Sequence, residues 1–289
     1  MIYTIAFLGT GILGSRIAQK LIAAGYTMLL YNRTMEKAKW LLEYGGYLLE
    51  TPEEAIKPAQ LVVCMVSDYN AANSVLFPND NIDYTGKAVY QMSTVSPQEN
   101  IILKQKVEER GGVFIECPVL GSVPQAESGE LIVMMGCQPQ QFEYYKGLFN
   151  HLSLNMVHTG EVGTAAATKL ALNQLIASMS AAFETSYGYL KAYGADVDKF
   201  MGILKNSALF APTFEKKLPN IENRKFEPAH FTAKMLLKDV NLITNAFAEK
   251  NIDVAPLQGV KQILEKTVEK NFGDMDYSVM YNVIYPDNK

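Results

Sequence analysis

The chain has little cysteine, and its few cysteines and histidines stand in no metal-binding pattern. Cys64, Cys117 and Cys137 form no C-x-x-C pair, and the three histidines lie at no recognisable ligand spacing. We therefore expect no metal site, and unpaired thiols of this kind fit a reducing cytoplasm. Basic runs are missing as well and the net charge is −4, so we expect no nucleic-acid partner.

Long apolar runs are also missing. No run approaches the ~20 residues that a membrane-spanning helix needs, so we expect no membrane partner. Met1 leads directly into an apolar stretch, so we expect no signal peptide. At 289 residues, of which 48% are hydrophobic and 19% charged, the chain is suited to two globular domains.

What is present begins with a glycine turn. Four apolar residues run into Gly9, Gly11 and Gly14, spaced as G-x-G-x-x-G, and a helical pattern follows. In such a turn the first glycine allows a sharp bend, the second lets a pyrophosphate approach the main chain, and the third lets the helix lie close to the sheet. The helix N-terminus then faces the phosphates. The alternative is a tight strand-to-helix turn without a ligand. The predicted dinucleotide site comprises Gly9, Thr10, Gly11, Ile12, Leu13 and Gly14.

Up to about residue 158, short apolar runs alternate with helical stretches. The expected strands cover residues 2–8, 27–31, 61–66, 88–92, 113–117 and 131–135. Residues 13–24 suit a first helix, Thr34 can cap a second through about residue 44, and Thr51 can cap a third. Alternation of this kind produces βαβ units and a parallel sheet. We therefore predict an α/β domain of Rossmann type over residues 1–159.

The pattern becomes helical from residue 160. A helix over residues 161 to about 187 would reach roughly 40 Å at 1.5 Å per residue. Pro212, Pro219 and Pro228 punctuate the helices that follow. Those helices are expected over residues 197–206, 231–250, 256–270 and 277–284. We predict an all-α C-terminal domain over residues 160–289, which the long helix joins to the first domain.

The loop after the second expected strand carries no acid. An NAD site of this type places Asp or Glu roughly 20 residues beyond the glycines, where it bonds the ribose 2′-hydroxyl. This chain has Asn32, Arg33 and Thr34 there. Arg33 can pair with a 2′-phosphate, and its two neighbours can donate to one. The loop therefore favours NADP, with a plain surface arginine as the alternative.

The long helix carries one lysine and one asparagine among small and apolar residues. Lys169 and Asn173 are four residues apart and so share a helix face. Burying a lysine is costly unless it is paired or used, and a lysine in such a setting shifts its pKa readily, which suits proton transfer. A lysine that extends to the surface from an amphipathic helix is an equal alternative.

Two further clusters have a functional and a plain interpretation. Lys234 and Lys238 share a helix face, so we expect a carboxylate or the cofactor to offset their like charge; the alternative is a solvated face. The Gly121-Ser122 step lies in a loop with prolines after an expected strand. Exposed N–H groups of such a loop can hold a carboxylate, although the segment also suits an ordinary loop.

Together these residues resemble the β-hydroxyacid dehydrogenase family over nearly the whole chain. The family has four motifs in order: the glycine turn, a substrate loop, a helix with a G-x-x-G step followed by K-x-x-x-N, and a K-D helix. The last three correspond here to residues 118–122, to Gly160, Gly163, Lys169 and Asn173, and to Lys238-Asp239. Residues 32–34, the Gly121-Ser122 step, Phe231 and residues 273–278 are most similar to the glyoxylate and succinic semialdehyde reductases.

The resemblance implies NADPH-dependent reduction of small aldehydes and 2-oxo acids that carry a carboxylate. Lys169 would be the general acid, and Asn173 would orient it or hold the substrate. The implied substrate pocket comprises Ser93, Thr94, Leu120, Gly121, Ser122, Phe231 and Asp239. The implied cofactor contacts add Met65, Val66, Thr94 and Lys238 to the glycine turn and to Asn32, Arg33 and Thr34.

The chain departs from the family pattern in the substrate loop. Leu120 stands where the family has serine, and Glu116-Cys117 replace Asp-Ala. The lost hydroxyl at position 120 either weakens carboxylate binding or moves that task to Ser122, which bears on substrate choice more than on reaction type.

Three rival functions remain open. An NAD-dependent 3-hydroxyisobutyrate-type dehydrogenase is disfavoured by the acid-free loop, and an imine reductase by the presence of Lys169. A non-catalytic cofactor-binding scaffold is disfavoured because Lys169 and Asn173 are both present. The many Tyr, Phe and Met residues of the helical half lead us to expect a homodimer or homotetramer.

Overall fold

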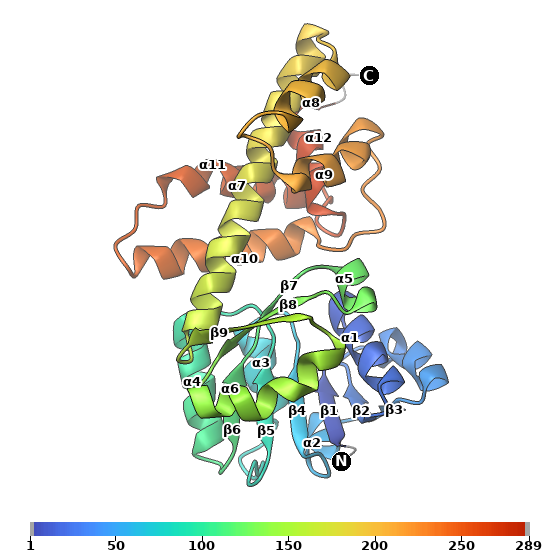
Figure 1. Cartoon of the computed structure of the whole chain (residues 1–289), viewed down its shortest axis with the longest axis vertical. Helices are drawn as coiled ribbons and strands as arrows, with labels where there is room; N and C mark the ends of the chain where they lie inside the picture. Colours follow the sequence, from blue (N-terminus) through green and yellow to red (C-terminus); the bar gives the residue numbers. More distant parts are fainter. Residues whose placement is uncertain (1–2, 287–289) are drawn as a thin grey trace. The chain divides into compact units, whose positions relative to one another are not determined.

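Nine strands form one sheet in the computed structural model, which describes residues 3–286. The sheet order is β3-β2-β1-β4-β5-β6-β8-β7, and β9 also pairs with β8. The strands are β1 (Thr4–Leu8), β2 (Thr27–Tyr31), β3 (Tyr47–Leu48), β4 (Leu61–Cys64), β5 (Ala88–Gln91), β6 (Val113–Glu116), β7 (Val119–Leu120), β8 (Ile132–Gly136) and β9 (Asn155–Gly160). They belong to the first of two compact units, residues 1–170, in which β1 to β6 run parallel (Figure 1).

Helices cover both faces of this sheet. They are α1 (Ile12–Ala23), α2 (Pro52–Ile56), α3 (Tyr69–Leu76), α4 (Pro97–Glu108), α5 (Val123–Ser128) and α6 (Pro139–Tyr145), with 3-10 turns η1 (Met35–Lys37), η2 (Lys39–Tyr44) and η3 (Lys146–His151). Successive side chains of a strand point to opposite faces. Ile5 and Phe7 therefore join the core that includes α1 and η3, whereas Ala6 and Leu8 join the core that includes α2, α3 and α4.

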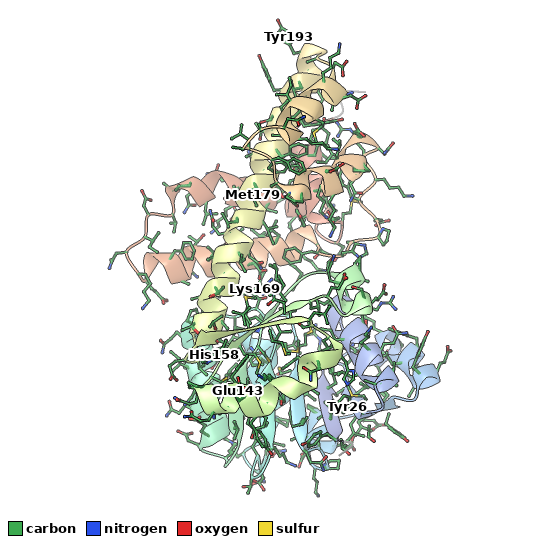
Figure 2. The ribbon with its side chains drawn as sticks, viewed as in Figure 1. Tyr26, Glu143, His158, Lys169, Met179 and Tyr193 are labelled. Carbon is green, nitrogen blue, oxygen red and sulfur yellow. The ribbon has the colours of Figure 1, made fainter. Side chains whose placement is uncertain are left out.

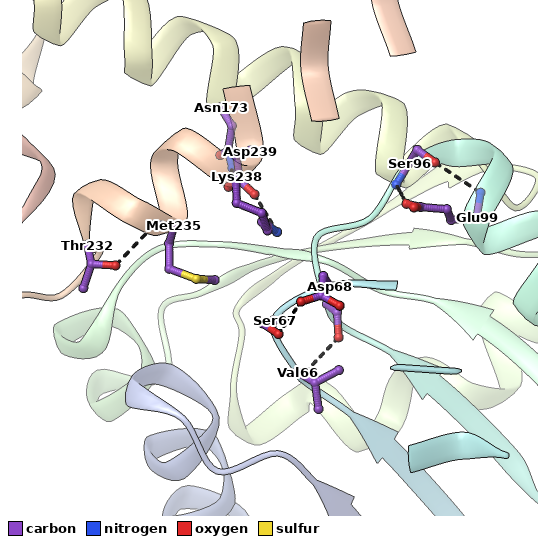
Figure 3. A network of polar contacts seen from close by, with 11 residues as sticks. Val66, Ser67, Asp68, Ser96, Glu99, Asn173, Thr232, Met235, Lys238 and Asp239 are labelled. Carbon is purple, nitrogen blue, oxygen red and sulfur yellow. Dashed lines mark hydrogen bonds and ion pairs between the residues drawn. The ribbon is translucent and has the colours of Figure 1, made fainter. Parts of the chain in front are cut away.

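Of the two side-chain caps that the sequence predicts, one is confirmed and one is wrong. Thr51 caps α2 as expected, in a capping box with Glu54. Ser96 forms another capping box with Glu99 at the start of α4 (Figure 3). Thr34 makes no capping bond, and the segment after it folds as η1 and η2 rather than as an α-helix, so that prediction is wrong. The Thr34 carbonyl instead accepts from the Asn32 side chain and from the Lys37 N–H, which closes a 3-10 turn.

The second unit, residues 171–289, is helical in the part that the structure describes. Its helices are the later part of α7 (Thr164–Tyr193), then α8 (Val197–Lys205), α9 (Pro212–Glu222), α10 (Ala233–Ala248), α11 (Ala255–Glu269) and α12 (Tyr281–Ile284), with the 3-10 turn η4 (Tyr277–Met280). Two apolar clusters hold them together, one around Leu236 and Leu264 and one around Phe183 and Tyr187. The predicted fold class is confirmed.

Several element predictions need correction. The run near residue 133 is β8, but it pairs antiparallel with β6 and β7, so the sheet is mixed at that side. Helix α7 begins at Thr164 because Gly163 adopts φ +105°, and it continues past Gly188 to Tyr193. Pro219 lies inside α9, where a break was expected. Ile2, in the first expected strand, lies outside the described residues. No helix of residues 3–286 is long and apolar enough to cross a bilayer.

The three cysteine thiols are buried in the first unit. Cys64, Cys117 and Cys137 stand at or just beyond the ends of β4, β6 and β8, and each is at most 1% exposed. Burial raises the pKa of the Cys64 thiol to about 12 and that of Cys137 to about 11. All three are free cysteines and stay protonated at neutral pH.

The second unit encloses a polar cluster. Lys217 on α9 forms an ion pair with Asp276 at 2.7 Å and lies over the ring of Tyr277. Glu184 on α7 is 1% exposed, and neither of its carboxyl oxygens has a hydrogen-bond partner among the described residues. Burial and the nearby charge of Asp276 raise the pKa of Glu184 well above the usual range, and Lys217 only partly opposes them. Glu184 is therefore held in its neutral form.

This neutral carboxyl makes the second unit less stable as the pH rises. The folded state binds a proton that the unfolded state releases above the ordinary glutamate pKa, so the unfolding free energy falls by about 1.4 kcal/mol per pH unit until the raised pKa is reached. Thermal unfolding of Glu184→Gln between about pH 5 and 9 should lack this slope. Glu249→Gln, at an exposed site, should keep it. Parallel slopes in all three proteins would show that Glu184 does not titrate.

Candidate cofactor and substrate site

The glycine turn leaves the N-terminus of α1 open. Gly9 has φ +104°, and a Cβ atom there would overlap the carbonyl oxygen of Met65. A Cβ at Gly14 would overlap the carbonyl oxygen of Gly9, so α1 begins in close contact with the turn. A Cβ at Gly11 would instead meet no atom within 4 Å. No side chain caps α1 and its first turn holds no acid, so its N–H groups are suited to a phosphate.

Asn32 fastens this turn to the loop after β2. Its Oδ1 accepts from the Thr10 N–H at 3.1 Å, and its Nδ2 donates to the Thr34 carbonyl at 2.7 Å. The Asn32 amide therefore shapes the loop in addition to any role toward a phosphate. Arg33 lies between these contacts and is exposed, as is Thr34. A dinucleotide thus fits the first unit, with the N–H groups of α1 toward its pyrophosphate and Arg33 available to a 2′-phosphate.

A hydrogen bond of Ser93 connects the segments that follow β4 and β5. The Ser93 hydroxyl accepts from the Val66 N–H at 2.9 Å, and the Ser93 N–H donates to the Gln91 side chain at 2.8 Å. Both contacts lie at the carboxyl ends of parallel strands, where open sheets of this kind bind ligands. Met65, Val66 and Thr94 are half-buried there, so the structure brings these predicted residues to one edge of the sheet.

The predicted substrate loop, residues 118–122, contains the short strand β7 and ends where α5 begins. Leu120 pairs with Ile132 in the sheet and is half-buried. Gly121 is exposed at φ +136°, and a Cβ there would lie 2.6 Å from the Leu131 side chain. The Ser122 hydroxyl donates to Gln125 Oε1 at 2.8 Å, and the Ser122 N–H donates to the same oxygen. A carboxylate bound by Ser122 must compete with Gln125.

Lys169 stands in the second turn of α7 and is half-buried (Figure 2). The start of this helix is held by a carboxylate from the end of β6. Glu116 accepts from the N–H groups of Gly163 at 2.7 Å and Ala166 at 2.8 Å, and it is fully buried. The side chain of Lys169 therefore projects from a helix whose first turn is fixed to the sheet.

Asn173 and Asp239 meet in the second unit. The Asn173 Nδ2 donates to Asp239 Oδ2 at 2.6 Å, and both side chains are 2% exposed (Figure 3). Lys238 lies 2.7 Å from the other oxygen of Asp239, and Lys234 forms an ion pair with Asp274. Carboxylates therefore offset both lysines of α10. Phe231, before this helix, packs edge-on against Tyr277 at 5.8 Å between ring centres.

Comparison with known proteins identifies the chain. The family described as the NAD binding domain of 6-phosphogluconate dehydrogenase matches residues 4–160. The family described as NAD-binding of NADP-dependent 3-hydroxyisobutyrate dehydrogenase matches residues 163–284. The chain belongs to the 3-hydroxyisobutyrate dehydrogenase family. It is thus an NAD(P)-binding oxidoreductase with a Rossmann domain, as the sequence motifs predicted.

The named relatives agree with this membership. Glyoxylate/succinic semialdehyde reductase 1 of Arabidopsis thaliana is 30% identical over 97% of this chain and 98% of its own length. A 3-hydroxyisobutyrate dehydrogenase structure from Mycobacterium tuberculosis has a TM-score of 0.88 at 19% identity, with 98% of this chain and 99% of that one covered. An imine reductase structure from Pseudomonas sp. has a TM-score of 0.67 at 18% identity, with 98% and 100% covered. The two structures show a shared fold.

The family motifs do not include every polar residue that the structure places at the edge of the sheet. Gln91 and Asn100 are at most 1% exposed and form hydrogen bonds there, yet no sequence motif predicts either as a site residue. The available signal was a glutamine ending the apolar run of β5 and an asparagine on the face of α4 that also carries Leu103 and Val107. Glu116 was noted only as a replacement for aspartate.

Gly11 and Gly14 should respond differently to alanine. Gly11→Ala adds a methyl group to open space, so the melting temperature should stay within about 2 °C while dinucleotide affinity falls about tenfold or more. Gly14→Ala pushes a methyl group into the Gly9 carbonyl and should lower both quantities. Calorimetric titration and thermal unfolding would measure them. Unchanged affinity in Gly11→Ala would place the pyrophosphate elsewhere.

Proposed function

We propose that this protein reduces small carboxylate-bearing aldehydes and 2-oxo acids, such as glyoxylate and succinic semialdehyde, to hydroxy acids with NADPH. The observation that carries the proposal is Lys169, which follows the G-x-x-G step of Gly160 and Gly163 and begins a K-x-x-x-N pattern with Asn173, on a helix whose start is fixed by a buried carboxylate. The reductase name of the Arabidopsis relative supports the substrate class.

In this proposal a bound nicotinamide supplies the hydride. Lys169 donates its ammonium proton to the carbonyl oxygen of the substrate, which becomes the hydroxyl of the product. Asn173 is held by Asp239 through its Nδ2, which leaves its Oδ1 as an acceptor for an ammonium or a substrate hydroxyl. Asn173 and Lys169 share one face of α7 by helix periodicity.

The substrate carboxylate is assigned to the loop between β7 and α5. Leu120 offers no hydroxyl, so Ser122 and the loop N–H groups take this task, with Ser93 and Thr94 as further donors. Because the Ser122 hydroxyl already donates to Gln125, binding requires that this bond be exchanged for one to the substrate. From the family motifs we assign Phe231 and Asp239 to substrate binding and Lys238 to cofactor binding.

The rival functions differ in cofactor and substrate. An NAD-dependent 3-hydroxyisobutyrate-type dehydrogenase requires no partner for a 2′-phosphate, whereas Arg33 is exposed in the loop after β2. An imine reductase or a non-catalytic scaffold has no use for the Lys169 and Asn173 pair. A panel of short oxo acids, aldehydes and cyclic imines with NADPH and NADH separates these functions.

We also propose that the protein is a homodimer or homotetramer in the cytoplasm. Between Lys169 and Lys191 the only charged residue of α7 is Glu184, which is buried. The exposed face of the helix therefore offers apolar side chains, including Leu175 at 49% and Tyr189 at 68% exposure, to a second copy. The three free thiols support a reducing compartment.

Replacing Lys169 tests the proton donor. Lys169→Ala should lower kcat by about 100-fold or more, because a positioned general acid contributes at least this much, while the fold is unchanged. In the wild-type enzyme, turnover should fall at high pH as the lysine loses its proton. Steady-state kinetics and circular dichroism provide both readouts. Turnover within about tenfold of wild type in a folded Lys169→Ala protein would exclude this role.

Replacing Arg33 tests the cofactor. Arg33→Ala should weaken NADPH binding by about tenfold or more and change NADH binding by less than about twofold, because only NADPH carries the 2′-phosphate. Lys37→Ala removes an exposed positive charge from the same loop region and serves as the matched control. Wild-type protein that binds NADH as tightly as NADPH would contradict the assignment.

A further inference from the structure

A buried chain of hydrogen bonds crosses the first unit from β4 to α7. The Val66 N–H donates to the Ser93 hydroxyl, and the Ser93 N–H donates to the Gln91 amide oxygen. Gln91 Nε2 donates to Asn100 Oδ1 at 3.4 Å, and Asn100 Nδ2 donates to Glu116 Oε1 at 2.6 Å. The side chains of Gln91, Asn100 and Glu116 are each at most 1% exposed.

Glu116 ends this chain at the N-terminus of α7. Its Oε1 accepts from Ala166 at 2.8 Å, and its Oε2 accepts from Gly163 at 2.7 Å and Ala165 at 3.3 Å. A Cβ at Gly136 would overlap Oε2, so the glycine leaves the space that the carboxylate fills. Helix ends normally leave these N–H groups for solvent or a local cap, whereas here a carboxylate from another element binds them.

The hydrogen bonds define the charge of Glu116. Each partner donates, and each carboxyl oxygen already accepts two hydrogen bonds, so a proton on either oxygen would meet a donor. Burial raises the pKa of Glu116, and the N–H groups of Gly163, Ala166 and Ala165 together with the Asn100 amide oppose that rise. The geometry suits the carboxylate, which the positive end of the helix also favours.

Lys169 lies directly beyond the anchored turn. It follows Ala166 by three residues, or about 4.5 Å along the helix axis. Side chains on a helix lean toward its N-terminus, so the lysine stem is directed back over the turn that Glu116 holds. Two thiols near Glu116, those of Cys117 and Cys137, stay neutral because burial raises the pKa of each. The carboxylate of Glu161, which precedes the helix, is exposed and accepts from the Gln138 side chain.

We propose that Glu116 is a positioning residue for Lys169, and that the chain through Asn100, Gln91 and Ser93 ties that position to the edge of the sheet where the cofactor is assigned. The carboxylate fixes the first turn of α7 and sets the field at its N-terminus. The proposal rests on the function given above, in which Lys169 is the proton donor. Glu116 itself touches neither substrate nor cofactor.

Glu116→Gln keeps the shape of the side chain and removes its charge. The variant should lower kcat about tenfold, with the KM of the aldehyde acid and the affinity for NADPH within about twofold of wild type. The alkaline limb of its pH profile should move to lower pH, because the lost negative charge no longer favours the ammonium. Amide hydrogen exchange at Gly163, Ala165 and Ala166 should quicken.

Two matched variants separate positioning from a general loss of stability. Val107→Ala removes a buried side chain from α4, the helix that carries Asn100, without touching the chain of hydrogen bonds. It should lower the melting temperature yet leave the alkaline limb and the exchange at the start of α7 unchanged. Glu116→Asp keeps the charge, so its alkaline limb should stay near that of wild type. Equal effects of Glu116→Gln and Val107→Ala would overturn the proposal.

A measurement without substrate distinguishes this proposal from the function on which it rests. Titration of the lysine amines by NMR, with the Lys169 signal assigned through Lys169→Arg, should give a lower pKa for Lys169 in Glu116→Gln than in wild type. An inactive wild-type protein with this shift would refute the reductase function and keep the positioning role. An active reductase without the shift would keep the function and refute the positioning role.

Discussion

The closeness of α1 to the end of β1 is the constraint on which the arrangement of the first unit depends. Two glycines make it possible, because Gly9 turns through a backbone conformation that side chains avoid and Gly14 packs directly on the Gly9 carbonyl. Gly11 serves differently, since the space above it is open. The three glycines therefore have different reasons. At Gly9 and Gly14 the fold itself leaves no space for a side chain, whereas at Gly11 a side chain would obstruct only a bound ligand.

The sequence predicted the elements whose signals are local. Alternation of apolar runs with helical patterns predicted β1, β2, β4, β5 and β6, but it missed the parallel strands β3 and β9. Thr51 was predicted as a helix cap, and it forms one. The alternation was not sufficient for β8, because the direction of a strand depends on the path of the connection and not on its own residues. Pro219 was misinterpreted because a proline with accommodated neighbours bends a helix without ending it.

The same division applies to the candidate site. The sequence motifs identified the glycine turn, Lys169 and the Lys238-Asp239 pair as candidate site residues. The roles of these residues stay predictions. The motifs could not predict contacts between segments that are distant in the sequence. The bonds of Asn32 to Thr10 and of Asn173 to Asp239 join residues 22 and 66 positions apart. Glu116 shows this most clearly, because a substitution that the family pattern marks as a departure holds the helix that carries Lys169.

The thiols of the sheet have a practical consequence. Cys64, Cys117 and Cys137 stand at three places along the sheet, and none exposes its sulfur in the folded state. A thiol reagent can therefore modify the protein only when the sheet opens locally. The rate of alkylation measures how often this opening occurs. In the purified protein, the alkylation of these native cysteines therefore reports opening of the sheet without any engineered probe.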